Sequence, residues 1–169
     1  LFVATSSTTV NALPILSTGW ATYVDTQYAT AGTAFTVLAN TDTIIPNNAG
    51  SKIEFQMPPD VESFYDGTVI TGRSGDSLDI MIFFKAVPSA VNQWAEIWID
   101  IGGSIGELYR QPVTFPKGAG VERGVMYAIP SGYTLGTWEA NGGTVYIESN
   151  ADLDIYKINY NFDRSHKAR

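Results

Sequence analysis

One stretch of the chain, from Gly75 to Gly103, contains two successive segments in which apolar and polar residues alternate. Each segment places apolar side chains at every second position: Leu78, Ile80, Ile82 and Phe84 in the first, and Ala95, Ile97, Ile99 and Ile101 in the second. A period of two residues is typical of β-strands. Pro88, Ser89 and Asn92 lie between the segments and favour a turn. The stretch therefore predicts two long antiparallel strands at the centre of a sheet.

The opposite faces of these two strands also carry large apolar side chains. Met81 and Phe83 lie on the first strand, and Trp94 and Trp98 lie on the second. An antiparallel sheet commonly turns one face to water, and an exposed apolar patch marks an interaction site. We therefore expect another layer or a partner to cover these side chains.

The rest of the chain contains further short strand signals separated by Gly, Pro, Asn and Asp. These segments are residues 19–28, 34–38, 43–45, 52–56, 68–71, 107–115, 121–129, 133–138, 144–148 and 153–162. Many short strands with almost no helix predict an all-β, antiparallel β-sandwich. Two four-stranded sheets in jelly-roll order fit the number of strands best. One helical turn is expected after Pro58 and Pro59, because acidic residues follow them.

The domain organisation follows from length and local composition. A chain of 169 residues is long enough for one domain with a sizeable core. Residues 1–18 are rich in Ser and Thr and are expected to form an extended N-terminal arm. Residues 19–163 are predicted to form the sandwich, and residues 164–169 a basic C-terminal tail.

Composition excludes several classes of protein. The chain has no cysteine, which excludes disulfide frameworks and thiol catalysis. Its net charge of −7 disfavours a nucleic-acid surface, because phosphate binding requires clustered Lys and Arg. No apolar run approaches the roughly 18 residues that a membrane span requires, so membrane insertion is not expected.

Several short motifs follow one another along the chain. They are GWATYVDTQY at 19–28, IPNNAG at 45–50, FYDG at 64–67, GDS at 75–77, FFKA at 83–86, DIGGSIG at 100–106, TFPKG at 114–118, NGGTVYIES at 141–149 and the ending DIYKINYNFDRSHKAR. Taken in this order, the motifs resemble those of a family of small tailed-bacteriophage virion proteins, and the resemblance covers residues 19–169.

The resemblance implies a trimeric jelly roll of the tumour-necrosis-factor (TNF) or complement-globular-head (C1q) type, located in the virion at the capsid surface or on the tail. It implies a non-enzymatic role as a capsid decoration (cement) protein, a fibre head or a knob. The implied partners are further copies of the chain and a major capsid or other virion protein. No catalytic residue or cofactor is implied. The alternative is a module that binds a receptor or glycan of the host surface.

Two sets of side chains are candidates for contact. A threefold interface is expected to bury some of the apolar and aromatic residues that are in excess for one core, namely Met81, Phe83, Trp98, Tyr156 and Tyr160. A stripe on one strand face, formed by Trp94, Glu96, Trp98 and Asp100, has the composition of a sugar platform. The alternative for both tryptophans is burial between sheets or subunits.

The basic tail contains Arg164, His166, Lys167 and Arg169 and is a candidate docking segment for an acidic surface. His166 is the only histidine, so a zinc site built on several histidines is excluded. Two loop clusters, Asp76 with Asp79 and Asp60 with Glu62 and Asp66, could offer oxygen ligands to calcium. Neither has the spacing of a calcium-binding loop, so no metal site is predicted.

Overall fold

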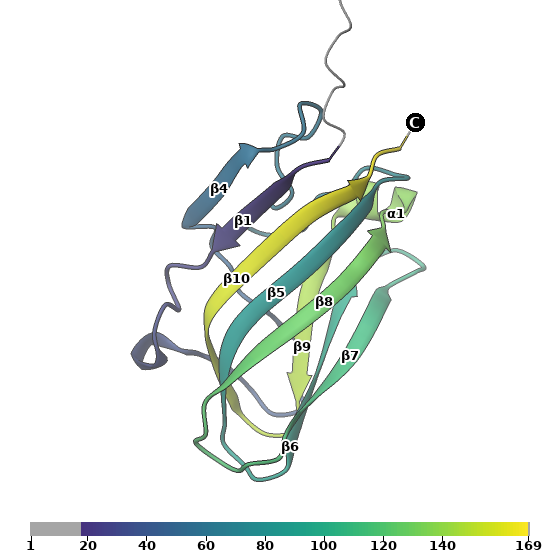
Figure 1. Cartoon of the computed structure of the whole chain (residues 1–169). Coiled ribbons are helices and arrows are strands. Elements are labelled where there is room, and N and C mark those ends of the chain that lie inside the picture. Colours follow the sequence, from purple (N-terminus) through teal and green to yellow (C-terminus); the bar gives the residue numbers. More distant parts are fainter. Residues whose placement is uncertain (1–17, 169) are drawn as a thin grey trace, which may run out of the picture.

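The computed structural model describes residues 18–168, and these form two packed β-sheets (Figure 1). The ten strands are β1 (Trp20–Val24), β2 (Phe35–Val37), β3 (Thr43–Ile44), β4 (Ser51–Gln56), β5 (Ser77–Pro88), β6 (Gln93–Asp100), β7 (Glu107–Phe115), β8 (Arg123–Tyr133), β9 (Thr144–Ser149) and β10 (Leu153–His166). A 3₁₀ turn, η1 (Ala31–Thr33), and one helix, α1 (Gly136–Asn141), complete the fold. The N-terminal arm expected for residues 1–18 lies, except for its last residue, outside the described residues.

The larger sheet has six strands in the order β4-β1-β10-β5-β8, with β2 also paired to β10. The smaller sheet has the order β3-β9-β6-β7, and all named strand pairs are antiparallel. Figure 1 shows the smaller sheet behind the larger one. The all-β antiparallel jelly-roll sandwich is therefore confirmed, with one sheet larger than the expected four strands.

The two strands of the stretch from Gly75 to Gly103 are confirmed, but their pairing is not as predicted. β5 pairs with β10 and β8 in the larger sheet, whereas β6 pairs with β7 and β9 in the smaller one. The chain crosses between the sheets at residues 89–92, where Asn92 adopts a positive φ of 53°. As a result the buried faces of the two strands, such as Ile82 and Ile97, belong to opposite walls of one core.

After Pro58 a single hydrogen-bonded turn forms, in which the Val61 N–H donates to the Pro58 carbonyl over 3.1 Å. The helix occurs at α1, which overlaps the segment 133–138 predicted as a strand. Trp138 of α1 is fully buried, and its indole N–H donates to the Ile70 carbonyl over 2.9 Å. This contact anchors the helix at one end of the sandwich. No helix within residues 18–168 combines the length and apolar character needed to cross a membrane.

A β-bulge in β10 changes which side chains face the core. The pairing with β5 shifts between Tyr156 and Asn159, and Lys157 has a positive φ of 53°. Tyr156 therefore lies on the outer side of the sheet opposite Lys85, while Ile158 and Tyr160 point into the core. Tyr156 and Tyr160, whose positions four residues apart would share a face in a regular strand, therefore lie on opposite sides of the sheet, because one extra residue reverses the alternation.

Candidate self-association face

The outer side of the six-stranded sheet, here called the six-stranded face, presents large apolar side chains to solvent. Phe83 of β5 pairs directly with Met126 of β8, and Met81 lies two residues before Phe83 on the same strand face. All three are exposed, and Phe83 keeps 37% of its surface accessible. We call these three residues the β5–β8 patch.

A second apolar group, the β1–β4 patch, lies at the opposite edge of the same face and consists of Trp20, Ile53 and Phe55. Trp20 and Phe55 meet edge to face with ring centroids 5.9 Å apart. Phe55 is 77% exposed, the highest value among the large apolar residues of the described chain. It therefore projects from edge strand β4 with little cover from the other described residues.

A polar column on β10, formed by Asn159, Asn161 and Asp163, separates the two patches. The Thr22 hydroxyl donates to the Asn161 side-chain carbonyl over 2.8 Å, which fixes the middle of the column. Asp163 lies directly opposite Asp79 of β5. Desolvation, together with the charge of Asp79, raises the pKa of the Asp163 carboxyl above its usual value. The two patches are thus separate surfaces on the same face of one sheet.

A hollow of about 380 Å³ opens beside the β5–β8 patch. Its lining residues are Phe83, Phe84, Lys85, Gly124, Val125, Met126, Lys157 and Asn159. Gly124 contributes no side chain, and a Cβ built there meets no atom within 4 Å. The missing side chain at Gly124, which pairs with Lys85, leaves space beside the Phe83–Met126 pair.

The structure divides the five residues of the predicted trimer interface. Met81, Phe83 and Tyr156 lie on the six-stranded face, although Tyr156 is buried and its hydroxyl donates to the Glu122 carboxylate, which also pairs with Lys85. Tyr160 lies in the core and donates to the Ile45 carbonyl over 2.9 Å.

Trp98, the fifth residue, belongs to β6 in the other sheet. The five side chains therefore do not form one surface. Met126, Trp20 and Phe55 were missed. The alternation of β8, which buries Val125, Tyr127 and Ile129, could have indicated that Met126 lies on the outer face.

The predicted stripe of Trp94, Glu96, Trp98 and Asp100 lies on the outer side of the four-stranded sheet, here called the four-stranded face. Trp98 is only 3% exposed. One side of its ring stacks on Tyr146 with centroids 5.7 Å apart, and the Arg110 guanidinium lies 3.8 Å from its centroid. Because both of its faces are covered, Trp98 offers no platform for a sugar ring.

Arg110 reaches this position through a second bulge. The register of β6 and β7 shifts between Ile97 and Ile99, and Tyr109 has a positive φ of 59°. The Arg110 guanidinium pairs with Glu96 at 2.8 Å and with Glu107 at 2.5 Å. Hydrogen bonding to Glu107 is the main cause of the raised pKa of Arg110. The four-stranded face thus closes over its own aromatic residue, and of the stripe only Trp94 keeps an exposed ring, at 38%.

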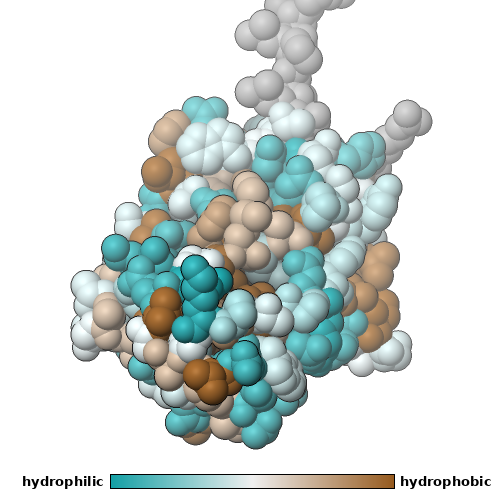
Figure 2. Space-filling model, turned by 60° about the horizontal axis from the view of Figure 1, so that its bottom comes forward, coloured by the Kyte–Doolittle hydropathy of each residue, from teal (hydrophilic) through white to brown (hydrophobic). Residues whose placement is uncertain are grey.

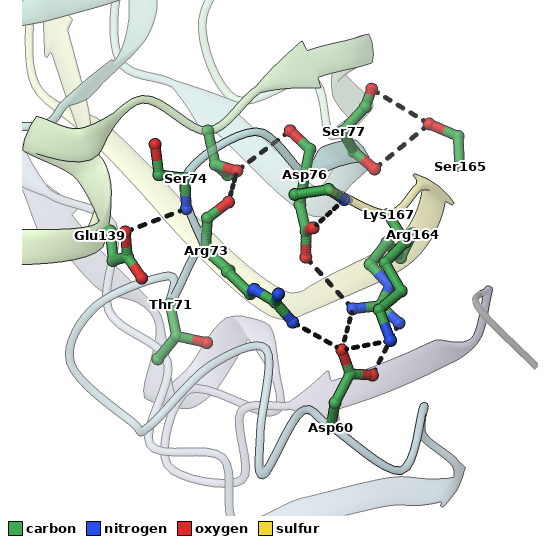
Figure 3. A network of polar contacts seen from close by, with 12 residues as sticks. Asp60, Thr71, Arg73, Ser74, Asp76, Ser77, Glu139, Arg164, Ser165 and Lys167 are labelled. Atoms are coloured by element: carbon green, nitrogen blue, oxygen red, sulfur yellow. Dashed lines mark hydrogen bonds and ion pairs between the residues drawn. The ribbon is translucent and has the colours of Figure 1, made fainter. Parts of the chain in front are cut away.

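A third cluster joins the end of β10 to the loop before β5 (Figure 3). Arg164 is fully buried; its guanidinium donates to Asp60 at 2.9 Å and to Asp76 at 3.2 Å. Asp60 also pairs with Arg73 and Lys167 (2.9 and 3.0 Å). The hydrogen bonds from Arg164, and then from Lys167, lower the pKa of Asp60 well below its usual value.

This cluster corrects the predicted docking tail. Arg164 is part of β10 and is buried, and Lys167 is paired within the chain, so neither extends into solvent as a hook. His166 is exposed, and Arg169 lies outside the described residues. The basic residues at this end hold the last strand in place by ion pairs that close within the molecule.

The carboxylates considered as calcium ligands do not converge. Asp60 and Asp76 bind Arg164, whereas Asp79 lies on the six-stranded face. A cavity of about 740 Å³ adjoins Asp60, Glu62 and Asp66. Within residues 18–168, no group of three or more His, Cys, Asp or Glu side chains is arranged to hold a metal ion.

Comparison with known proteins bears on the fold alone. No protein-family model matches the sequence, and no curated protein matches it. The structure of Eiger TNF from S. frugiperda aligns with a TM-score of 0.55 at 8% identity, over 89% of this chain and 96% of that chain. The fold is a TNF-like jelly roll. At 8% identity this likeness extends no further than the fold.

Two viral proteins also align at lower scores. The PRD1 vertex protein has a TM-score of 0.45 at 12% identity, over 89% of this chain and 73% of that chain. The tobacco streak virus coat protein has a TM-score of 0.38 at 14% identity, over 93% of this chain and 91% of that chain. At TM-scores below 0.5, these two likenesses establish nothing further about the chain.

Proposed function

We propose that the chain is a non-enzymatic structural protein of a tailed-bacteriophage virion that forms a homotrimer through its six-stranded face. The observation that supports this most strongly is the pair of apolar patches on that face, which residues 18–168 leave uncovered. Exposed apolar patches of this kind mark protein contacts, and aromatic residues and Met are enriched at them. The resemblance of the sequence motifs to phage virion proteins supports the virion as the location.

Within the virion, decoration of the capsid surface is favoured over a fibre or tail knob. A trimer carries three copies of any capsid-binding surface, so weak contacts with a major capsid protein add through multivalency. Such a protein stabilises the shell by bridging neighbouring subunits. Its function requires no bound cofactor and no reaction.

Electron microscopy of intact particles that contain the chain tests this placement. The expected result is density for a trimer on the capsid surface, in contact with the major capsid protein. Density at the tail alone would contradict capsid decoration and would indicate a tail knob. Absence of the chain from purified particles would contradict the virion role altogether.

A host-glycan-binding module is the second candidate, and one observation favours it. Trp94 keeps an exposed ring on the four-stranded face, two residues before Glu96 on the same strand face. A glycan array with the unmodified chain and the Trp94→Ala variant tests it. Binding that disappears with Trp94→Ala while the trimer persists would support recognition, and no binding by either protein would contradict it.

A further inference from the structure

The two apolar patches of the six-stranded face have complementary shapes. The β1–β4 patch ends in Phe55, which is 77% exposed and projects from edge strand β4. The β5–β8 patch borders a hollow of about 380 Å³ above Gly124. A cavity of about 150 Å³ lined by apolar side chains is sufficient to bind benzene. The hollow therefore has room for a phenyl ring over Gly124, beside the paired side chains of Phe83 and Met126.

The symmetry of a ring explains why one face carries two different patches. In a closed ring with more than two copies, each copy contacts the next through two different surfaces. In a twofold dimer, by contrast, a surface can meet its own counterpart. The polar column of Asn159, Asn161 and Asp163 separates the projection from the hollow, so each can serve a different neighbour.

The charges that flank the two patches also differ in sign. Asp163 lies directly opposite Trp20, so its carboxylate borders the β1–β4 patch. Within residues 18–168 this carboxylate forms no ion pair. Lys85 and Lys157 line the hollow; Lys85 pairs with Glu122, whereas Lys157 forms no ion pair within the same residues and leaves a positive charge at the rim. Opposite charges at the rims of two surfaces favour their association and fix its orientation.

From shape, symmetry and charge we infer that the β1–β4 patch of one copy packs against the β5–β8 patch of the next, with Phe55 inserted into the hollow above Gly124. The occupant of the hollow is therefore a second copy of this chain. This inference rests on the proposed trimer and specifies which surfaces meet in it. Three such contacts close the ring.

Cysteine cross-linking tests the pairing directly, because the chain contains no cysteine of its own. Gln56 adjoins Phe55 and is exposed, and Lys157 borders the hollow and is exposed. Within one copy the two positions lie more than about 13 Å apart along β10, since Gln56 and Asp163 both pair with Trp20. The double variant Gln56→Cys with Lys157→Cys is treated with a short bis-maleimide, and its products are separated on a denaturing gel.

The expected result is covalent dimers and trimers from the double variant and only monomers from either single variant. A matched control combines Lys157→Cys with Val91→Cys, since Val91 is 70% exposed in the loop between β5 and β6, outside both patches, and it should remain monomeric. Dimers from a single variant would show that like surfaces meet, which overturns the inference. A double variant that sediments as a trimer but does not cross-link would also overturn it, while leaving the proposed function intact.

Filling the hollow provides a second measurement that does not depend on cross-linking. Gly124→Trp occupies the space that Phe55 would enter and should raise the dissociation constant of the trimer at least 10-fold. Phe55→Ala should do the same, whereas Leu38→Ala, at a residue 58% exposed outside both patches, should not. A trimer unaffected by both Gly124→Trp and Phe55→Ala overturns the inference. A parent chain that sediments as a monomer contradicts the trimer itself and, with it, this inference.

Discussion

The two outer faces of the sandwich differ in how far their aromatic rings are covered by the chain itself. On the four-stranded face, Trp98 is covered by Tyr146 and by Arg110, which is itself held by carboxylates. On the six-stranded face, Phe83 and Phe55 remain open to solvent. Within residues 18–168, Trp98 is thus covered by its own chain, whereas Phe83 and Phe55 are not. The apolar content of a sheet face therefore indicates a partner only after the chain's own covering residues have been located.

A local feature of the backbone or sequence accounts for each outcome. The bulge at Tyr109 lets β7 place Arg110 above Trp98, because an extra residue redirects the following side chain. On the other face, Gly124 removes a side chain beside Phe83. Whether the ring of Trp98 or Phe83 is covered thus depends on a single residue of the neighbouring strand.

The largest effect is expected from Trp98→Ala. Because the Trp98 ring is buried between Tyr146 and Arg110, its removal should lower the free energy of unfolding by about 3–5 kcal/mol. Urea denaturation at a fixed chain concentration measures this change. A stability loss below about 1 kcal/mol would mean that Trp98 is not part of a closed structural stack.

Two aromatic residues of nearly equal exposure provide a matched test of the faces. Phe83→Asp, on the six-stranded face, should weaken the trimer at least about 100-fold, because an unpaired carboxylate buried in an interface costs about 3–5 kcal/mol. Trp94→Asp, on the four-stranded face, should leave the trimer unchanged. Sedimentation velocity over a dilution series measures both. Equal weakening by the two substitutions would remove the distinction between the faces.

Lowering the pH tests the ion-pair cluster around Arg164, which holds one end of the sandwich together through contacts within the chain. Arg164 holds the pKa of Asp60 below its unfolded value of about 3.9, so this stabilisation is complete above that pH and is lost as the pH falls through the lowered pKa. Asp60→Asn should therefore lower stability by about 1.5–3 kcal/mol at pH 7, the strength of a hydrogen bond to a charged group.

Urea titrations of the parent and the Asp60→Asn variant between pH 7 and pH 2 check this expectation. The difference between the two proteins should shrink as the pH falls below about 4. A difference that stays constant with pH would show that the Asp60 carboxylate is not held by Arg164. Leu38→Ala is a suitable control, since Leu38 is exposed and its apolar side chain forms no hydrogen bond with a titrating group.

The smallest effect is expected from Arg110→Met, which keeps an apolar cover over Trp98 but removes the charge. The loss of stability should be about 0.5–1 kcal/mol, because Arg110 is partly exposed and ion pairs at such sites contribute little. Added salt should reduce the difference between parent and variant. A loss that salt does not reduce would assign the role of Arg110 to packing.

Alternation in the sequence was sufficient to predict the faces of β5 and β6 and the all-β class. It could not predict that these strands belong to different sheets, since alternation identifies the buried face of a strand but not the strands with which it pairs. The β-bulges in β10 and β7 could not be predicted from the sequence either. They place Lys157 and Tyr109 at positive φ, a conformation that glycine or asparagine would have signalled but Lys and Tyr do not.

The candidate sites show the same limit. The stripe from Trp94 to Asp100 does share one face, as predicted, but the cover supplied by Arg110 depends on a bulge in another strand. Arg164 was assigned to a solvated tail because its neighbours in sequence are basic. Its acidic partners, Asp76 and Asp60, lie 88 and 104 positions away in the chain. Contacts at such separations follow from the fold and not from local composition.

The central claim is that copies of the chain supply the missing cover of the six-stranded face. Sedimentation equilibrium of the purified chain at micromolar concentration tests it most directly. The expected mass is three times the 18.3 kDa of one chain, and it should fall to that of a single chain for Phe83→Asp. A parent chain that sediments as a monomer under these conditions would contradict the claim.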